Sequence, residues 1–288
     1  MLIKIGLRDM SPEVVAFARI ALAAAVLMPI AAAQGAFSGL RGRLGVIALV
    51  GAVQVAGPFL LIPIGEQHIT SALAGILVAT TPIFTALLAI RMDHEERSEG
   101  LRLVGVGVGV AGVALLFGFD LGDSSTALLG GLAVVLASVG YSIGGFVVKH
   151  RLSHARPLGV VAAVMTASAL MLLIPALVTA PASGPGLGPI AAVVALGVFG
   201  TGAAFVIFYL LIGTVGPART MIVSYLAPGF AVLYGATLLG ETISAATIIG
   251  LVLIVGGSWL AIGGDNASLA EAEEEGLPEE ALDVGPRP

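Results

Sequence analysis

The sequence has no cysteine and few charged residues. The absence of Cys from its 288 residues excludes disulfide bonds, thiolate nucleophiles and cysteine metal sites. Charged residues make up only 11% of the chain, against about 25% in a typical soluble domain. Too few charges remain to cover a water-soluble surface, and 58% of the residues are hydrophobic. The composition therefore predicts a membrane protein.

Long apolar runs account for most of the chain. Each has roughly 18–25 residues, enough for a helix to cross about 30 Å of hydrocarbon, and they are too many for a cleavable signal peptide. We predict an all-α protein with nine complete membrane-spanning helices, at approximately 12–33, 44–64, 69–90, 102–119, 127–148, 157–180, 188–211, 217–239 and 243–263. The order Ser11, Pro12 and Glu13 predicts where the first of these begins. Residues 1–7 are apolar but too short to cross, so we expect that most of a preceding helix is missing.

Basic residues alternate between the connections of the predicted helices. They occur in or beside every second connection, at Arg41 and Arg43, at Arg91, Arg97 and Arg102, at Lys149, Arg151 and Arg156, and at Arg219. The connections between them, at 65–68, 120–126, 181–187 and 240–242, contain no Lys or Arg. Basic residues favour the cytoplasmic side, so we predict a multi-pass protein of the cell (plasma or inner) membrane with a cytoplasmic C-terminus.

The C-terminal tail differs from the rest of the chain. Residues 264–288 contain eight acidic residues and one basic residue, which leaves 12 basic and 10 acidic residues in the apolar part. A short, acidic segment with few apolar side chains cannot bury enough surface to fold alone. We predict a disordered cytoplasmic tail.

The two halves of the chain resemble each other. A shift of 146 residues aligns Phe59 with Phe205, Pro82 with Pro228, Leu87 with Leu233, and Glu95 with Glu241. The loop at 91–101 is basic, whereas its counterpart at 240–242 has no basic residue. The halves are therefore predicted to be inverted relative to each other. Inverted repeats are typical of secondary transporters, which bind substrate near the midplane between the repeats.

The aligned segments also resemble a known family, the EamA transporters of the drug/metabolite transporter superfamily. Residues 65–74 read Gly-Glu-Gln-His-Ile-Thr-Ser-Ala-Leu-Ala, and 79–87 read Ala-Thr-Thr-Pro-Ile-Phe-Thr-Ala-Leu. The second half is similar at 216–219, 226–230 and 239–243, the last reading Leu-Gly-Glu-Thr-Ile. Phe17-Ala18-Arg19, followed by a long Ala/Leu run, resembles the second helix of the family.

This resemblance implies a specific architecture. Members of the family have ten helices in two inverted five-helix repeats, with both termini in the cytoplasm. The resemblance places the first repeat at 1–118, a linker at 119–126, the second repeat at 127–263 and the tail at 264–288. The sequence departs from the family at its start, where most of the first helix is absent.

Ionisable groups at membrane depth are costly, so each is a candidate functional residue. Arg19 lies eight residues into its predicted span, about 12 Å deep, and Glu66 closes the outer end of the next span. We hypothesise that the two approach each other and that protonation of Glu66 helps to switch an outer gate. The alternative is a snorkelling arginine and an interfacial glutamate that act independently.

A second group of residues is predicted to line the substrate pathway: Gln54, Pro82, Tyr141, Tyr209, Tyr225 and Pro228. The two prolines occupy matching positions and interrupt helices either at a binding site or only for packing. The glutamine either binds substrate or bridges two helices. The tyrosines either line a cavity or satisfy their hydroxyl groups within the bundle.

Signals for other functions are weak. The run Gly105-x-Gly107-x-Gly109 lies inside a span and is not a nucleotide fingerprint, which needs a preceding strand. The four His and the scattered acids show no metal-ligand spacing. We therefore predict no catalytic residues, no metal and no cofactor, and we do not expect an enzyme.

The leading interpretation is a secondary-active transporter that exports small metabolites, amino-acid-like compounds or drugs by alternating access. Its partners would be the lipid bilayer, a small-molecule substrate and, as coupling ion, protons; no nucleic acid is expected, and the protein would be a monomer or a homodimer. The alternative is a non-transporting integral membrane subunit or scaffold. An intramembrane enzyme ranks third.

Overall fold

The computed structural model describes residues 1–92, 101–121, 124–207 and 222–274, with side chains over 1–88, 103–121, 124–207 and 226–261. Every regular element in these ranges is a helix: α1 (Leu2–Gly6), α2 (Pro12–Ala33), α3 (Leu44–Val50), η1 (Gly51–Ala56), α4 (Gly57–Glu66), α5 (Ser71–Val78), α6 (Thr81–Met92), α7 (Leu101–Phe119), α8 (Ser125–Leu152), α9 (Pro157–Val178), α10 (Leu187–Gly197), η2 (Val198–Ala203), α13 (Ile222–Leu238) and α14 (Ala245–Glu274). The segments η1 and η2 are π-helical.

The helical segments coincide with the predicted membrane spans. Six are long and apolar enough to cross a membrane: Pro12–Ala33, Leu44–Glu66, Ser71–Leu88, Ser125–Leu152, Pro157–Val178 and Leu187–Ile207. Shorter apolar helices cover Leu103–Phe119, Leu226–Leu238 and Ala245–Ala261. The prediction of a multi-pass α-helical membrane protein is confirmed, while the count of ten helices stays a prediction.

The start of α2 follows its sequence signal. Ser11 has extended backbone geometry, and its hydroxyl oxygen accepts a hydrogen bond from the backbone N–H of Val14 at 3.3 Å. Pro12 is the first helical residue and Glu13 lies in the first turn. The serine thus satisfies one of the backbone donors that every helix start leaves without an intrahelical partner.

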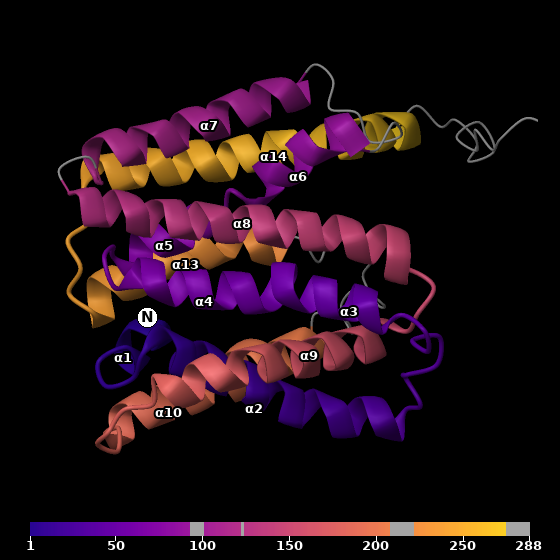
Figure 1. Cartoon of the computed structure of the whole chain (residues 1–288). Helices are drawn as coiled ribbons and strands as arrows, with labels where there is room; N and C mark the ends of the chain where they lie inside the picture. Colours follow the sequence, from indigo (N-terminus) through magenta and orange to yellow (C-terminus); the bar gives the residue numbers. More distant parts are fainter. Residues whose placement is uncertain (93–100, 122–123, 208–221, 275–288) are drawn as a thin grey trace, which may run out of the picture.

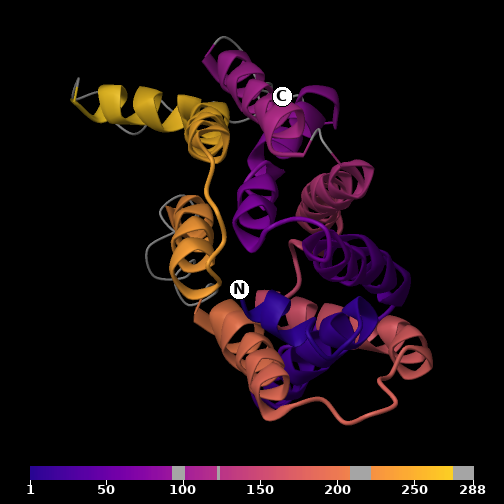
Figure 2. The ribbon, with the colours of Figure 1, turned by 90° about the vertical axis from the view of Figure 1, so that its left-hand side faces the viewer.

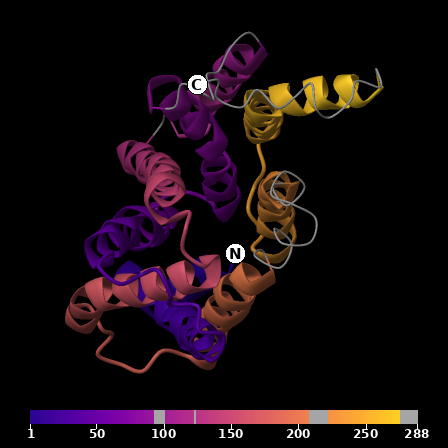
Figure 3. The same cartoon turned by 90° about the vertical axis from the view of Figure 1, so that its right-hand side faces the viewer.

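Helices from distant parts of the chain lie side by side (Figure 1). The main pairs are α1 with α10, α2 with α9, α4 with α8, α5 with α13, and α7 with α14. In the two views along the bundle (Figures 2 and 3), α6, α7 and α14 form one side, and α1, α2, α9 and α10 form the opposite side. The pairs α4–α8 and α5–α13 lie between them and connect the two sides.

Small residues allow α7 and α14 to approach at backbone distance. A Cβ added to Gly257 would lie 2.5 Å from the backbone nitrogen of Gly109 and 2.6 Å from the carbonyl oxygen of Gly105. Gly107, between these two, faces open space and meets no atom within 4 Å. The two outer glycines of the run therefore serve helix packing, which in membranes depends on small residues.

Candidate functional site

The predicted site residues of the described chain lie on six elements, one of which is α13 with Pro228. Arg19 is on α2, Gln54 in η1, Glu66 at the end of α4, Pro82 in α6 and Tyr141 on α8. Buried apolar side chains form two clusters, and the ring of Tyr141 packs against both of them. Arg19 and Tyr141 both contact the ring of Phe59, and Gln54 lines the same cavity as Phe59 and Tyr141. The other three predicted residues lie outside this group.

Arg19 is held by a hydroxyl group and an aromatic ring. Its Nε donates to Thr201 Oγ1 in η2 at 2.8 Å, and its guanidinium carbon lies 3.9 Å from the centroid of the Phe59 ring. Thr201 itself donates to the carbonyl oxygen of Leu196 at 3.0 Å, five residues back along the π-helical segment. A cation over an aromatic face is attracted by the ring. Among the residues that the structure describes, the positive charge is therefore stabilised by the ring and the hydroxyl group and not by an ion pair.

The ring of Phe59 also connects to Tyr141. The two rings meet edge to face, with centroids 6.4 Å apart and an interplanar angle of 73°, an arrangement that aromatic pairs prefer. Together with Gln54, they line a cavity of about 120 Å³ whose other walls are apolar and include Val50, Met165 and Phe205. A dry cavity of about 150 Å³ is large enough for benzene, so this one has room for a small apolar group.

Gln54 and Tyr141 are the polar residues of this cavity. Within the described chain, neither the amide of Gln54 nor the hydroxyl of Tyr141 has a hydrogen-bond partner, and neither group is fully shielded from solvent. The glutamine therefore forms no hydrogen bond between two helices within the described ranges, and its part in substrate binding stays a prediction. A mostly apolar cavity with a few polar groups is typical of a small-molecule site.

A glycine on α8 makes room for the glutamine. A Cβ added to Gly144 would lie 2.3 Å from Cβ and 2.7 Å from Cγ of Gln54. The next residue, Gly145, has no atom within 4 Å of the same position. The close approach at Gly144 therefore sets where Gln54 stands in the cavity.

The helix formed by α5 and α6 is interrupted just before Pro82, at Ala79 and Thr80. Proline cannot donate to the carbonyl one turn back, which belongs here to Val78. That oxygen instead accepts from Thr81 Oγ1 at 2.8 Å. The interruption expected at Pro82 is present, and its part in a substrate pathway stays a prediction.

Hydroxyl groups of neighbouring helices satisfy the other carbonyls of this interruption. Ser138 donates to Leu77 at 3.1 Å, Ser142 donates to Thr81 at 2.9 Å, and Ser258 donates to Ala79 at 2.9 Å. Backbone groups in hydrocarbon need protein partners because no water is present. Sequence reasoning assigned this role to none of the three serines, although a hydroxyl residue inside an apolar span is the available signal.

The second half does not repeat the interruption. Pro228 lies inside α13, which runs from Ile222 to Leu238 without a break. The matching prolines therefore have different local structures in the two halves. Two further predicted pathway positions, Tyr209 and the side chain of Tyr225, lie outside the described residues.

Glu66 is almost completely buried, with 4% of its surface exposed. Its Oε2 is the only buried side-chain oxygen or nitrogen of the described chain without a hydrogen-bond partner. No ion pair of 4.0 Å or less joins Glu66 to Arg19, although the two charges act on each other, and Lys4 and Glu241 also act on Glu66. An unsatisfied buried oxygen costs about 1–3 kcal/mol, so a donor or proton that reaches it is bound with a corresponding gain. The roles of Arg19 and Glu66 stay predictions.

Glu241 is a structural contact that the sequence did not reveal. From the connection before α14, its two carboxylate oxygens accept hydrogen bonds from the backbone N–H groups of Ser71 at 2.7 Å and Ala72 at 3.0 Å. Thr70 caps the same helix start by accepting from the N–H of Leu73 at 3.2 Å. A carboxylate at a helix N-terminus is favourable because of the helix dipole. Glu241 thus ties the second half of the chain to the start of α5.

The candidate site combines a few polar side chains with an apolar cavity. Gln54 and Tyr141 offer two hydrogen-bonding groups to the apolar cavity, and the guanidinium of Arg19 lies over the ring of Phe59, which also lines it. Among the described residues, no group of three or more His, Asp or Glu side chains is placed to hold a metal ion. A lining of this kind suits a small molecule that has both polar and apolar parts.

Known proteins resemble the chain over most of its length. The sequence model of the EamA-like transporter family matches residues 1–118 and 128–263. The protein named "Uncharacterized inner membrane transporter YedA", of Escherichia coli strain K12, is 29% identical over 259 residues, which cover 88% of this chain and 82% of that protein. The protein named "Probable terminal-alkyne amino-acid exporter", of Streptantibioticus cattleyicolor, is 26% identical over 260 residues, which cover 90% of this chain and 86% of that protein.

A solved crystal structure shares the fold. It superposes with a TM-score of 0.61 at 24% sequence identity, and the match covers 88% of both chains. At this identity the likeness concerns the arrangement of the helices.

The cap that Glu241 forms is expected to depend on Gly235. A Cβ at position 235 would lie 2.4 Å from Glu241 Oε2, so Gly235→Ala displaces the carboxylate from the two N–H groups. We expect this variant to lose about 1–3 kcal/mol of stability, measured by thermal unfolding of the purified protein in detergent. Gly229→Ala is the matched control, because it lies on the same helix and meets no atom within 4 Å.

This control variant is expected to unfold at or slightly above the wild-type temperature, since alanine favours helix more than glycine does. Adding Glu241→Ala to Gly235→Ala should cost little more, because both changes remove the same contact. Equal unfolding temperatures for the two glycine variants, or fully additive losses in the double variant, would contradict this role of Gly235.

Proposed function

Because the chain belongs to the EamA-like transporter family, we propose that it is a secondary-active transporter that exports small organic molecules by alternating access. Two inverted repeats, at 1–118 and 127–263, would form the two sides of the substrate pathway. Residues 119–126 would join them, and 264–288 would form a cytoplasmic tail. The substrate would be a metabolite, an amino-acid-like compound or a drug.

The pairing of the helices is the main support for this proposal. We take the first half as α1, α2, α3 to α4, α5 to α6, and α7, and the second half as α8, α9, α10 to η2, α13 and α14. When each helix is replaced by its counterpart in the other half, the pairs α2–α9, α5–α13 and α7–α14 stay the same. The pair α1–α10 becomes α8–α4, which is also present. Halves with equivalent contacts can exchange their conformations, which is the basis of alternating access.

The two π-helical segments support the same division. η1 spans Gly51–Ala56 and η2 spans Val198–Ala203, so both have six residues and they begin 147 positions apart. π-Helical segments are rare and are often found at functional sites. Here one carries Gln54, which lines the cavity, and the other carries Thr201, which holds Arg19.

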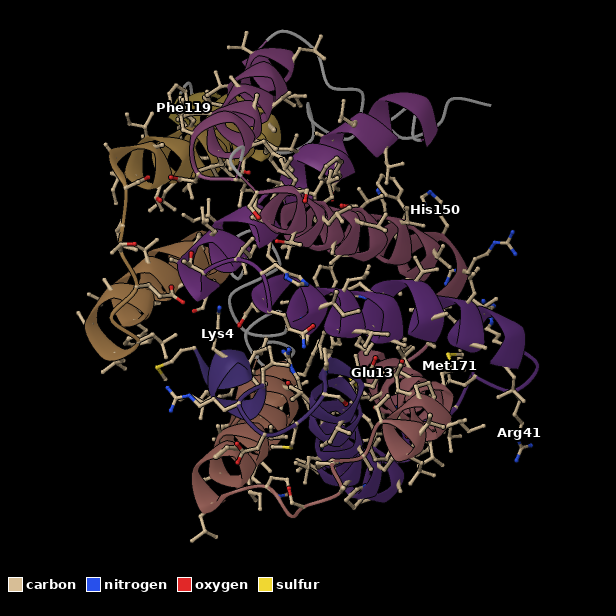
Figure 4. The ribbon with its side chains drawn as sticks, turned by 60° about the vertical axis from the view of Figure 1, so that its left-hand side comes forward. Lys4, Glu13, Arg41, Phe119, His150 and Met171 are labelled. Carbon is tan, nitrogen blue, oxygen red and sulfur yellow. The ribbon has the colours of Figure 1, made fainter. Side chains whose placement is uncertain are left out.

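Contacts between the basic loops support the proposed orientation. Arg43 Nη1 donates to the carbonyl oxygen of Arg151, and Arg156 Nη1 donates to the carbonyl oxygen of Gln34 at 2.7 Å. These basic connections therefore lie at one end of the bundle, where Arg41 also points outward (Figure 4). The positive-inside rule assigns this end, and with it the C-terminus, to the cytoplasm.

The composition of the cavity supports a substrate with a polar head and an apolar body. Gln54 and Tyr141 offer hydrogen-bonding groups that have no partner in the described part of the chain, and the guanidinium of Arg19 lies against the neighbouring ring of Phe59. An amino-acid-like compound has this combination of charge and apolar surface. One relative is named as a probable amino-acid exporter.

A non-transporting membrane subunit or scaffold is the second candidate. The amide of Gln54 and the hydroxyl of Tyr141, which have no hydrogen-bond partner among the described residues, favour transport, because a purely structural bundle gains nothing by leaving such groups unsatisfied. An enzyme is not proposed, since the described polar groups suit recognition.

Metabolite measurements test the proposed export. We expect at least one small polar metabolite to accumulate inside cells that lack the protein and to fall outside them, as measured by untargeted mass spectrometry of cells and medium. Restoring the gene should reverse both changes. Identical metabolite levels in both strains, combined with loss of a co-purifying membrane complex, would favour the scaffold.

The cavity itself can be tested with Gly144→Ala. The added methyl group collides with the stem of Gln54, not with its flexible end, so η1 has to shift. We expect export of the identified substrate to fall roughly tenfold, the equivalent of about 1.4 kcal/mol, in proteoliposomes. Gly145→Ala adds the same methyl group where no atom lies within 4 Å and should export normally. Equal export by both variants would exclude this cavity from the substrate pathway.

Glu66 is proposed to couple export to protons. Glu66→Gln keeps the size of the side chain but cannot exchange a proton, so we expect its export rate to lose most of the pH dependence seen for the wild type. The measurement is export from proteoliposomes over a series of external pH values. Glu13→Gln is the control, because Glu13 lies in the first turn of α2 and has no proposed role. An unchanged pH profile for Glu66→Gln would remove Glu66 from the coupling mechanism.

A further inference from the structure

A groove lies between the start of α3 and the end of α8, apart from the candidate substrate cavity. It has a volume of about 300 Å³ and is lined by Val46, Leu49, Ile143, Phe146, Val147, His150 and Arg151. Five of these residues are apolar, and the two polar ones are basic or able to become so. The groove thus has an apolar floor with a basic end.

The apolar part faces outward from the helix bundle. Leu49 is 51% exposed and Ile143 is 38% exposed, while Phe146 is buried and forms the floor. In a membrane-spanning bundle, exposed apolar side chains of spanning helices face lipid tails. From Ile143 to Arg151 the helix rises about 12 Å, so an acyl chain has a continuous apolar surface along this part of α8.

The basic end lies in the last turn of α8. The ring of His150 stacks on Phe146, with centroids 6.0 Å apart and an interplanar angle of 9°, and its Nδ1 lies 2.9 Å from the Phe146 carbonyl oxygen. The ring is therefore fixed at the mouth of the groove, at the end of the bundle where Arg41 also lies (Figure 4). The side chain of Arg151 is exposed beside it.

A further positively charged side chain lies at the basic end of the groove. Arg43 donates to the carbonyl oxygen of Arg151, which brings a second guanidinium to the mouth of the groove. The sequence contains no Asp or Glu in 34–43 or in 146–156, the two segments that meet here. Neither of these two segments therefore supplies a carboxylate to this end of the groove.

We propose that this groove binds one anionic phospholipid. Its phosphate would lie between His150 and Arg151, and one acyl chain would lie along Val46, Leu49, Ile143 and Val147. Charge complementarity favours an anionic phospholipid. The groove is basic where a membrane lipid carries its phosphate and apolar where the lipid carries its tail. A zwitterionic lipid would offer the same tail but no net negative charge.

The test is lipid retention by the purified, full-length protein. Native mass spectrometry would compare phosphatidylglycerol with phosphatidylcholine of the same acyl chains, for the wild type and for variants. We expect the wild type to retain phosphatidylglycerol preferentially and Arg151→Gln to bind it about fivefold more weakly. Arg41→Gln removes the same charge from the same end of the molecule, outside the groove, and should bind as the wild type does.

Two further arms separate a bound lipid from a soluble phosphate and from a general effect of surface charge. Ile143→Trp fills the apolar part without changing charge, and it should also weaken retention of phosphatidylglycerol. Glycerol phosphate, which has a similar head but no tail, should neither compete with the lipid nor raise the unfolding temperature. Equal retention of both lipids, equal losses in Arg41→Gln and Arg151→Gln, or competition by glycerol phosphate would overturn the proposal.

Discussion

The structure depends on satisfying backbone hydrogen bonds where no water is available. An unbroken helix meets this requirement by itself, but this chain interrupts its helices inside the bundle, at two π-helical segments and before Pro82. Each interruption is tolerated because side-chain hydroxyls take over, as Ser138 does for Leu77 and Ser258 does for Ala79. These interruptions are what allow non-helical geometry next to the candidate site, so the hydroxyl residues are as necessary to the fold as the apolar ones.

The same constraint governs the charged groups. Arg19 is stabilised by the face of Phe59 and by Thr201, which itself returns a hydrogen bond to the backbone of η2. Glu241 is stabilised by two backbone N–H groups at the start of α5. Glu66 differs from both, since one of its oxygens has no partner within the described chain. Among the described residues, the other buried side-chain oxygens and nitrogens have hydrogen-bond partners, which is why the proposed proton coupling centres on Glu66.

Several features could be predicted from the sequence because they are local. The spans, the start of α2 at Ser11 and the interruption at Pro82 each follow from residues close together in the chain. The contact of Arg19 with Thr201 joins residues 182 positions apart, and no local pattern indicated it. Depth in the membrane suggested Glu66 as a partner for Arg19. Depth, however, gives the height of a residue along its helix and not the direction in which its side chain points.

The sequence by itself determined that this protein is embedded in a membrane, where its helices cross and which family it belongs to. Bilayer thickness and hydrophobicity act on each segment separately, so these properties can be deduced one helix at a time. Only the tertiary structure decided which helices are neighbours, and therefore that Gln54 and Tyr141 share a cavity and that Glu241 caps α5. Which helices can pack closely depends on small residues such as Gly144 and Gly257, and these residues contact distant parts of the chain.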